Sequence, residues 1–156
     1  MLNYSYPQIV VTEIPDEISL ALSISGCPLR CPNCHSKETY PNDFGKQLDS
    51  FEMERLLDKN KLISCVLFYG GEWDKYALIN LLNIVKNRGY KTALYTGLEV
   101  GEIPRTIYQM LDYIKVGSYI EELGTLRDSN TNQRLIELAT GKDITYKFRH
   151  MEVRND

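Results

Sequence analysis

Three cysteines lie within eight residues near the amino end of the chain, in the pattern Cys27-x3-Cys31-x2-Cys34. Pro28 and Pro32 lie between them. Because proline removes a backbone donor and disfavours helix, we expect this segment to be a loop that wraps around a bound group. Thiolates are ligands for zinc and for iron–sulfur clusters, so three thiolates on one loop indicate a metal or redox site.

Three kinds of site remain open for this loop. A structural zinc site needs a fourth ligand, usually from a second paired motif, and the sequence has none. A four-iron cluster usually takes four cysteines, and a cluster held by three would leave one iron open to a substrate. A thioredoxin-like pair at Cys31 and Cys34 would normally open a helix, and it gives Cys27 no role. The fourth cysteine, Cys65, lies in the apolar run LISCVLFY, and we expect it to be a small buried residue.

The bulk composition fits one globular domain over residues 1–156, with 43% hydrophobic and 25% charged residues. A formal net charge of -3 argues against general binding to nucleic acid or to a membrane surface. The amino end lacks the basic and apolar regions of a secretion signal, and no apolar run approaches the ~20 residues that span a bilayer. We therefore expect a cytoplasmic protein with reduced thiols, which favours metal or redox chemistry over disulfides.

Apolar patterning predicts strands that alternate with helices along most of the chain. This alternation is typical of βαβ units, so the predicted fold class is α/β with a mostly parallel sheet. We expect Ser50 to be the N-cap of the first helix. Strands are predicted at 9–12, 18–25, 62–69, 91–96, 113–116 and, as an edge strand, 145–150, and helices at 50–56, 73–87, 103–111 and 132–139.

Four of the predicted strands end in turns that contain glycine. These turns hold Gly26, Gly70-Gly71, Gly97 and Gly117. In α/β folds, ligands gather beyond the carboxyl ends of the parallel strands. The cysteine loop is therefore predicted to lie at the edge of the sheet where chemistry takes place.

The cysteine spacing after an early strand resembles the motif of radical S-adenosylmethionine enzymes. Gly70-Gly71-Glu72, after the next strand, resembles the turn with which that superfamily contacts the methionine end of S-adenosylmethionine. Within the superfamily, the chain is similar to the activating protein of the anaerobic ribonucleoside-triphosphate reductase. The similarity includes the short length, Tyr95-Thr96-Gly97, the predicted strand 112–117 and the segment 126–135.

This resemblance implies a truncated partial βα barrel and a set of site residues. Cys27, Cys31 and Cys34 would bind three irons of a [4Fe–4S] cluster, and S-adenosylmethionine would chelate the fourth. The cofactor-binding residues implied are Asn33, Cys34, His35, Gly70, Gly71 and Glu72, and residues implied to contact the partner or the cofactor are Arg127, Asn132, Gln133 and Arg134.

The resemblance also implies the reaction and its partners. The reduced cluster would cleave S-adenosylmethionine to methionine and a 5′-deoxyadenosyl radical, which would take hydrogen from a glycine of the large subunit of the reductase. A flavodoxin-type protein would supply the electron. No acid–base pair or activated nucleophile is evident in the sequence, and such a hydrogen transfer needs none. A zinc-bound interaction module and a radical enzyme acting on a small molecule remain alternatives.

Two residues depart from the pattern of these families. Asn33 stands where the superfamily favours an aromatic residue before the third cysteine, with His35 after that cysteine. Asp128 stands in the late segment where a glycine is commoner, so the backbone there is expected to differ.

Overall fold

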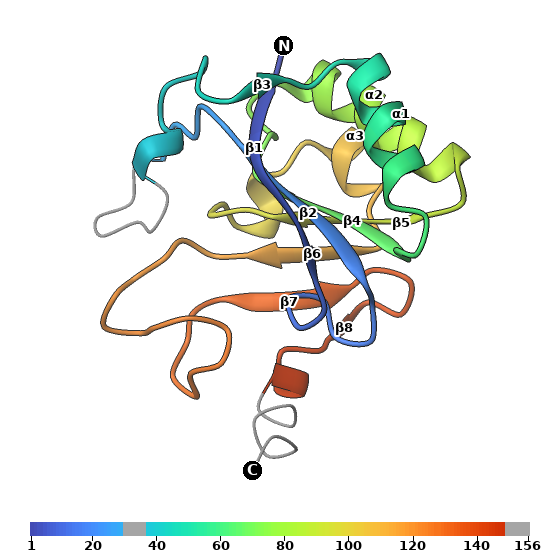
Figure 1. Cartoon of the computed structure of the whole chain (residues 1–156). Coiled ribbons are helices and arrows are strands. Elements are labelled where there is room, and N and C mark those ends of the chain that lie inside the picture. The colour runs from blue at the N-terminus through green and yellow to red at the C-terminus, as the bar shows by residue number, and fades with distance from the viewer. Residues whose placement is uncertain (30–36, 149–156) are drawn as a thin grey trace.

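A single eight-stranded sheet forms the centre of the computed structural model, which describes residues 1–29 and 37–148 (Figure 1). The strand order is β3-β1-β2-β4-β5-β6-β7-β8. The strands are β1 Asn3–Val10, β2 Ser19–Ile24, β3 Lys46–Gln47, β4 Cys65–Tyr69, β5 Lys91–Tyr95, β6 Tyr113–Val116, β7 Arg134–Glu137 and β8 Lys142–Asp143. The helices are α1 Ser50–Lys59, α2 Lys75–Asn87 and α3 Arg105–Tyr108, with short 3-10 turns η1 Lys37–Thr39 and η2 Val100–Glu102.

The four central strands are parallel, and the strands at both ends of the sheet are antiparallel. β2, β4, β5 and β6 pair in parallel register, with Leu22 opposite Phe68 and Phe68 opposite Leu94. β1 and β3 extend one side of the sheet in antiparallel pairing, and β7 and β8 extend the other. The predicted α/β class is confirmed. Its parallel part is limited to the centre of an open, mixed sheet.

The helices cover one face of the sheet, as Figure 1 shows for α1, α2 and α3. Leu20 and Leu22 of β2 pack into a large apolar core with residues of these helices. Ala21 points to the opposite face, where a smaller core includes Leu135 of β7 and Phe148. Successive side chains of a strand face opposite sides. The apolar character of β2 therefore follows from burial on both faces, as the sequence predicted.

The first two long helices begin at aspartates. Asp49 is the N-cap of α1, and its carboxylate accepts from the backbone N–H of Glu52 at 2.8 Å. The prediction that Ser50 caps this helix is therefore wrong, because Ser50 is already helical and its hydroxyl accepts from Asn80. Asp74 caps α2, which begins two residues later than predicted. An aspartate at this position satisfies a backbone donor that the helix itself leaves unpaired.

The predicted helix at 132–139 is wrong, because this segment contains strand β7. Arg134 to Glu137 pairs antiparallel with β6, and Leu135 is fully buried in the smaller core. The predicted edge strand at 145–150 is also wrong over its described part. Residues 146–148 are helical, and this turn buries Phe148 against the same core.

Several predicted boundaries also shift. The first strand, β1, runs from Asn3 to Val10 and not over 9–12, and α3 is confined to Arg105–Tyr108. β4 begins at Cys65, so Leu62 lies in the preceding turn and is 91% exposed. Among the described residues, no helix has the length and apolar character needed to cross a membrane.

Candidate functional site

A pocket of about 760 Å³ lies at the carboxyl ends of the parallel strands. Residues at the ends of the four parallel strands line it: Ile24 of β2, Tyr69 of β4, Tyr95 of β5 and Lys115 of β6. Cys27 lines the same pocket, directly after β2. Of the features predicted to meet at one edge of the sheet, Cys27, Gly70 and Gly97 line this pocket.

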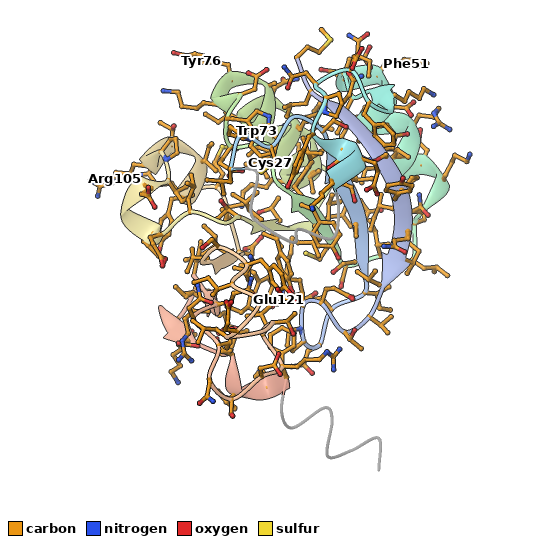
Figure 2. The ribbon with its side chains drawn as sticks, turned by 90° about the vertical axis from the view of Figure 1, so that its left-hand side faces the viewer. Cys27, Phe51, Trp73, Tyr76, Arg105 and Glu121 are labelled. Carbon is orange, nitrogen blue, oxygen red and sulfur yellow. The ribbon has the colours of Figure 1, made fainter. Side chains whose placement is uncertain are left out.

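The turn after β4 depends on glycine. Gly70 and Gly71 have φ angles of 95° and 113°, in the region that side chains other than glycine rarely adopt. A Cβ atom on Gly70 would lie 2.5 Å from Cη2 of Trp73. The indole ring therefore packs directly on the glycine backbone. Gly70, Trp73 and Cys27 all line the pocket, and Figure 2 labels the last two.

Glu72, which follows these glycines, is a buried carboxylate in the pocket wall, with 7% of its surface exposed. Its Oε1 atom accepts a hydrogen bond from the hydroxyl of Thr96 at 2.7 Å. Its Oε2 atom is buried and has no hydrogen-bond partner among residues 1–29 and 37–148. Burial raises the pKa of Glu72, while the bond from Thr96 and the charge of Lys115 act in the opposite direction. A buried acceptor without a partner costs stability, and a ligand donor would relieve that cost.

Lys115 brings a buried positive charge to the same pocket, with 8% of its surface exposed. Its Nζ atom donates to the carbonyl of Gly117 at 3.2 Å and lies 5.6 Å from the centre of the Tyr95 ring. Sequence reasoning missed this residue. The signal was a single lysine in the otherwise apolar strand YIKV, where burial of the whole strand forces the charge into a closed environment.

Aromatic side chains form much of the remaining wall. Tyr69 and Tyr95 contact each other edge to face, with ring centres 5.4 Å apart. The Tyr95 hydroxyl donates to the backbone carbonyl of Glu13, and burial raises the pKa of Tyr95 well above its usual value. Tyr40 and Trp73 also line the pocket. Such rings limit the access of water and offer flat surfaces to a planar ligand group.

Of the three predicted metal ligands, Cys27 is described and lies at the pocket. Cys31 and Cys34, together with Asn33 and His35, fall within 30–36, outside the described residues. Over residues 1–29 and 37–148, no three histidine, cysteine, aspartate or glutamate side chains are grouped to hold a metal ion.

Cys65 lies apart from this site and has the role that the sequence predicted. It is fully buried in the smaller core, and burial raises the pKa of its thiol to about 12. A thiol that stays protonated at neutral pH is a poor metal ligand, because the thiolate is the form that binds.

The four residues of the late segment occupy different environments. Arg127 and Gln133 line the pocket. Asn132 donates from Nδ2 to the carbonyl of Ser118 at 3.0 Å, and Arg134 is exposed with Nε 3.8 Å from Asp143. Only the first two are thus placed to meet a ligand in the pocket.

Asp128 in the same segment stabilises a turn. Its carboxylate accepts from the backbone N–H of Thr125 at 2.7 Å, and it lies where a Cβ atom on Gly124 would stand. The aspartate therefore satisfies a backbone donor in the turn.

Comparison with known proteins bears on the cysteine loop and its surroundings. A family model described as a 4Fe-4S single cluster domain matches residues 18–136. This range includes the three clustered cysteines, the Gly70-Gly71-Glu72 turn and all four parallel strands. A search of curated proteins and a search of solved structures found no match. Because the match spans more than half of the chain, the protein belongs to the family of 4Fe-4S single cluster domains.

Proposed function

We propose that this protein is a radical S-adenosylmethionine enzyme that activates the anaerobic ribonucleoside-triphosphate reductase by creating a glycyl radical on its large subunit. Membership of a 4Fe-4S family is compatible with this chemistry. The observation that carries the proposal is that a buried acidic residue, Glu72, and a buried basic residue, Lys115, line one pocket with Cys27.

The charges of this pair match those of an α-amino acid. The methionine end of S-adenosylmethionine carries an ammonium and a carboxylate. The unpartnered Oε2 of Glu72 would accept from the ammonium, and the Nζ of Lys115 would donate to the carboxylate. In a buried site, such charge-assisted hydrogen bonds are stronger than bonds between neutral groups. The aromatic wall with Tyr40 and Trp73 would receive the adenine ring.

The cysteine loop fits the implied cluster by its chemistry. Thiolates are the usual ligands of iron–sulfur clusters, and Cys27 is at the pocket wall. Cys27, Cys31 and Cys34 would hold the cluster, leaving one iron for the ligand. When bound and reduced, the cluster supplies the electron that cleaves the carbon–sulfur bond of S-adenosylmethionine. The chain itself would orient the amino-acid end and exclude water through its aromatic wall.

The open sheet and the late segment support the choice of a polypeptide substrate. The parallel strands place their carboxyl ends around the pocket as the strands of a βα barrel do, so we interpret the sheet as a truncated barrel. Fewer strands would leave room for a loop of the reductase. Arg127 and Gln133, from the segment that resembles the activators, line the pocket and would face that loop or the cofactor.

The test begins with the protein reconstituted anaerobically with iron and sulfide. Methionine and 5′-deoxyadenosine are measured after addition of S-adenosylmethionine and a reductant, for the parent chain and for Glu72→Gln and Lys115→Met. We expect product from the parent and at least a tenfold weaker affinity for S-adenosylmethionine in each variant, because each loses one charge-assisted contact. Glu54→Gln, on the outer surface, is the matched control.

The reductase is tested separately. The large subunit is added, and electron paramagnetic resonance is recorded with normal glycine and with glycine deuterated at Cα. A protein radical whose spectrum narrows on deuteration supports activation of the reductase. Cleavage of S-adenosylmethionine with no such radical would refute the reductase as partner and favour a small-molecule substrate. Failure of the parent to cleave S-adenosylmethionine would refute the whole proposal.

A further inference from the structure

Thr96 lies directly after β5 and is almost fully buried at the pocket, with 3% of its surface exposed. Its backbone N–H donates to the carbonyl of Lys115 at 2.9 Å, which fixes its main chain to the neighbouring strand β6. Its side chain is therefore attached to the rigid part of the sheet and does not depend on a loop for its position.

The hydroxyl of Thr96 makes two hydrogen bonds whose directions are determined. Its Oγ1 atom accepts from the backbone N–H of Leu98 at 3.1 Å. The same oxygen lies 2.7 Å from Oε1 of Glu72 and donates its proton to that atom. The amide of Leu98 can only donate and an ionised carboxylate can only accept, so the single hydroxyl proton of Thr96 is directed to Glu72. The arrangement stabilises the ionised form of Glu72 and favours one orientation of its carboxylate group.

The two oxygens of Glu72 consequently have different environments. Oε1 accepts from Thr96, and Oε2 has no partner in the part of the chain that the structure describes. Without the Thr96 hydroxyl, the Glu72 carboxylate would lose the side-chain donor that holds Oε1 in a buried site. The carboxylate would then rotate toward another donor or take up a proton, since burial disfavours its charge.

We propose that Thr96 is a positioning residue, which orients Glu72 so that its Oε2 atom is available to the ammonium group of S-adenosylmethionine. This inference rests on the proposed function, because it takes the methionine end of that molecule as the ligand of Glu72. Thr96 acts through Glu72 and contacts neither the ligand nor the cluster in this account.

The test is a double-mutant cycle on binding of S-adenosylhomocysteine, which has the same amino-acid end and is not cleaved. The proteins are the reconstituted parent, Thr96→Val, Thr96→Ser, Glu72→Gln and the double variant Thr96→Val/Glu72→Gln. Valine keeps the shape of threonine and removes the hydroxyl, while serine keeps the hydroxyl. Iron content and the thermal midpoint of each protein show that it is folded and loaded. The same titrations with S-adenosylmethionine, in the absence of reductant, check the choice of probe.

We expect Thr96→Val to weaken binding of the parent roughly tenfold, the size of one hydrogen bond to a charged group. Thr96→Ser should stay within about threefold of the parent. In the Glu72→Gln background, Thr96→Val should have almost no further effect, because the residue through which Thr96 acts has lost its charge. A role in packing alone would give the same loss with and without Glu72, and that result would overturn the inference.

The outcomes separate this inference from the proposed function. Equal affinity of the parent and Thr96→Val, with the parent binding normally, would refute the role of Thr96 and leave the proposed function intact. No binding of either S-adenosyl compound by the parent would refute the proposed function, and the role of Thr96 would fall with it. If serine fails to rescue binding while iron content and thermal midpoint are unchanged, the hydroxyl is not the operative group and the inference is wrong.

Discussion

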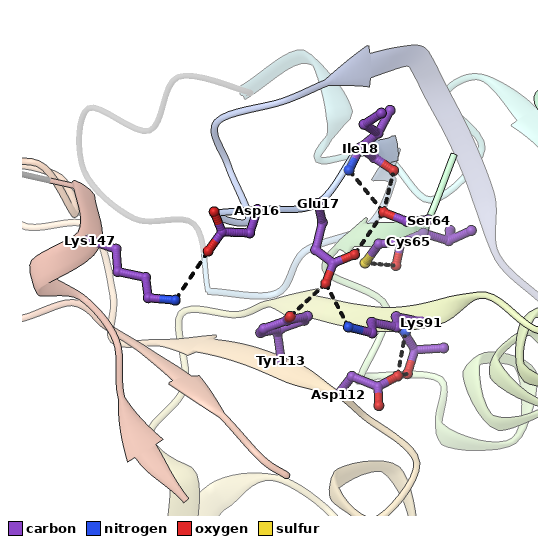
Figure 3. A network of polar contacts seen from close by, with 11 residues as sticks. Asp16, Glu17, Ile18, Ser64, Cys65, Lys91, Asp112, Tyr113 and Lys147 are labelled. Carbon is purple, nitrogen blue, oxygen red and sulfur yellow. Dashed lines mark hydrogen bonds and ion pairs between the residues drawn. The ribbon is translucent and has the colours of Figure 1, made fainter. Parts of the chain in front are cut away.

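Glu17 connects the starts of all four parallel strands, and its replacement by glutamine is predicted to destabilise the fold strongly. It precedes β2, and its carboxylate accepts hydrogen bonds from the residues at the start of the other three strands (Figure 3). Oε1 accepts from Ser64 at 2.7 Å, and Oε2 accepts from Tyr113 at 2.7 Å and from Lys91 at 2.9 Å. The residue is 7% exposed.

The size of the stability loss depends on how many of the hydrogen bonds to Glu17 a glutamine can still accept. Its single carbonyl oxygen accepts from some of these donors, but its NH₂ group cannot accept at all. A hydrogen bond to a buried charged group contributes about 1.5–3 kcal/mol. Lys91 is 53% exposed and returns to water, so its ion pair adds little. We therefore expect the free energy of unfolding to fall by about 3 kcal/mol, mostly from the bond with buried Tyr113.

Urea unfolding followed by far-ultraviolet circular dichroism measures this change. Glu54→Gln is the control, because Glu54 pairs with Arg88 on the surface and its loss should cost less than about 0.5 kcal/mol. If Glu17→Gln unfolds within about 0.5 kcal/mol of the parent, the carboxylate does not hold the strands together and the reasoning is refuted.

The pH dependence gives an independent check. Burial alone would raise the pKa of Glu17, but the hydrogen bonds from Lys91, Tyr113 and Ser64 outweigh burial and lower it. The ionised carboxylate therefore stabilises the fold above the unfolded-state pKa of about 4.3. This contribution is lost as the pH falls through the lower folded-state pKa. The difference between parent and variant should be constant near neutral pH and shrink under acidic conditions.

Three further predictions concern the pocket and the cysteines. Cys27→Ala should lose most of the iron and sulfide after anaerobic reconstitution, whereas Cys65→Ala should keep both; equal metal content in the two variants would contradict the assignment of ligands. Gly70→Ala should lower the thermal midpoint more than Gly89→Ala, because both have positive φ but only the first places a Cβ atom against the ring of Trp73; an equal loss would show that the ring moves freely aside. Since Trp73 is the only tryptophan and lines the pocket, S-adenosylmethionine should change the intrinsic fluorescence, and an unchanged spectrum at saturation would place the ligand elsewhere.

The parallel centre of the fold could be predicted because its signals are local. The apolar run before Gly70 buries both of its faces only if it lies between other strands. Leu78, Leu81 and Val85 have the spacing of one helix face, which predicts α2. The glycine turns then place the site, since parallel strands end at one edge. These features depend on few distant contacts.

The carboxyl-terminal part could not be predicted in the same way. Leu135, Ile136 and Leu138 suit a helix face by spacing, yet the segment pairs with β6 and becomes β7. The cause is tertiary packing. As a strand, the segment pairs with the edge of β6 and buries Leu135 in the smaller core with Phe148, which an isolated helix could not do. Sequence alone gives no measure of such a distant partner.

In the site, too, local motifs could be predicted and residues brought together by the fold could not. The cysteine spacing and the Gly70-Gly71-Glu72 turn are contiguous motifs, and they could be recognised directly. The pairing of β4, β5 and β6 brings Lys115 and Thr96 to the same pocket as Glu72, so no contiguous motif unites the three residues.

The proposed function requires that Cys27, Cys31 and Cys34 bind a four-iron cluster with one iron open to S-adenosylmethionine. Electron paramagnetic resonance of the reduced, anaerobically reconstituted protein, recorded with and without S-adenosylmethionine, tests it most directly. We expect about four irons per chain and a cluster signal that changes when S-adenosylmethionine is added. A signal that is indifferent to saturating S-adenosylmethionine, or a chain that holds zinc in place of iron, would contradict it.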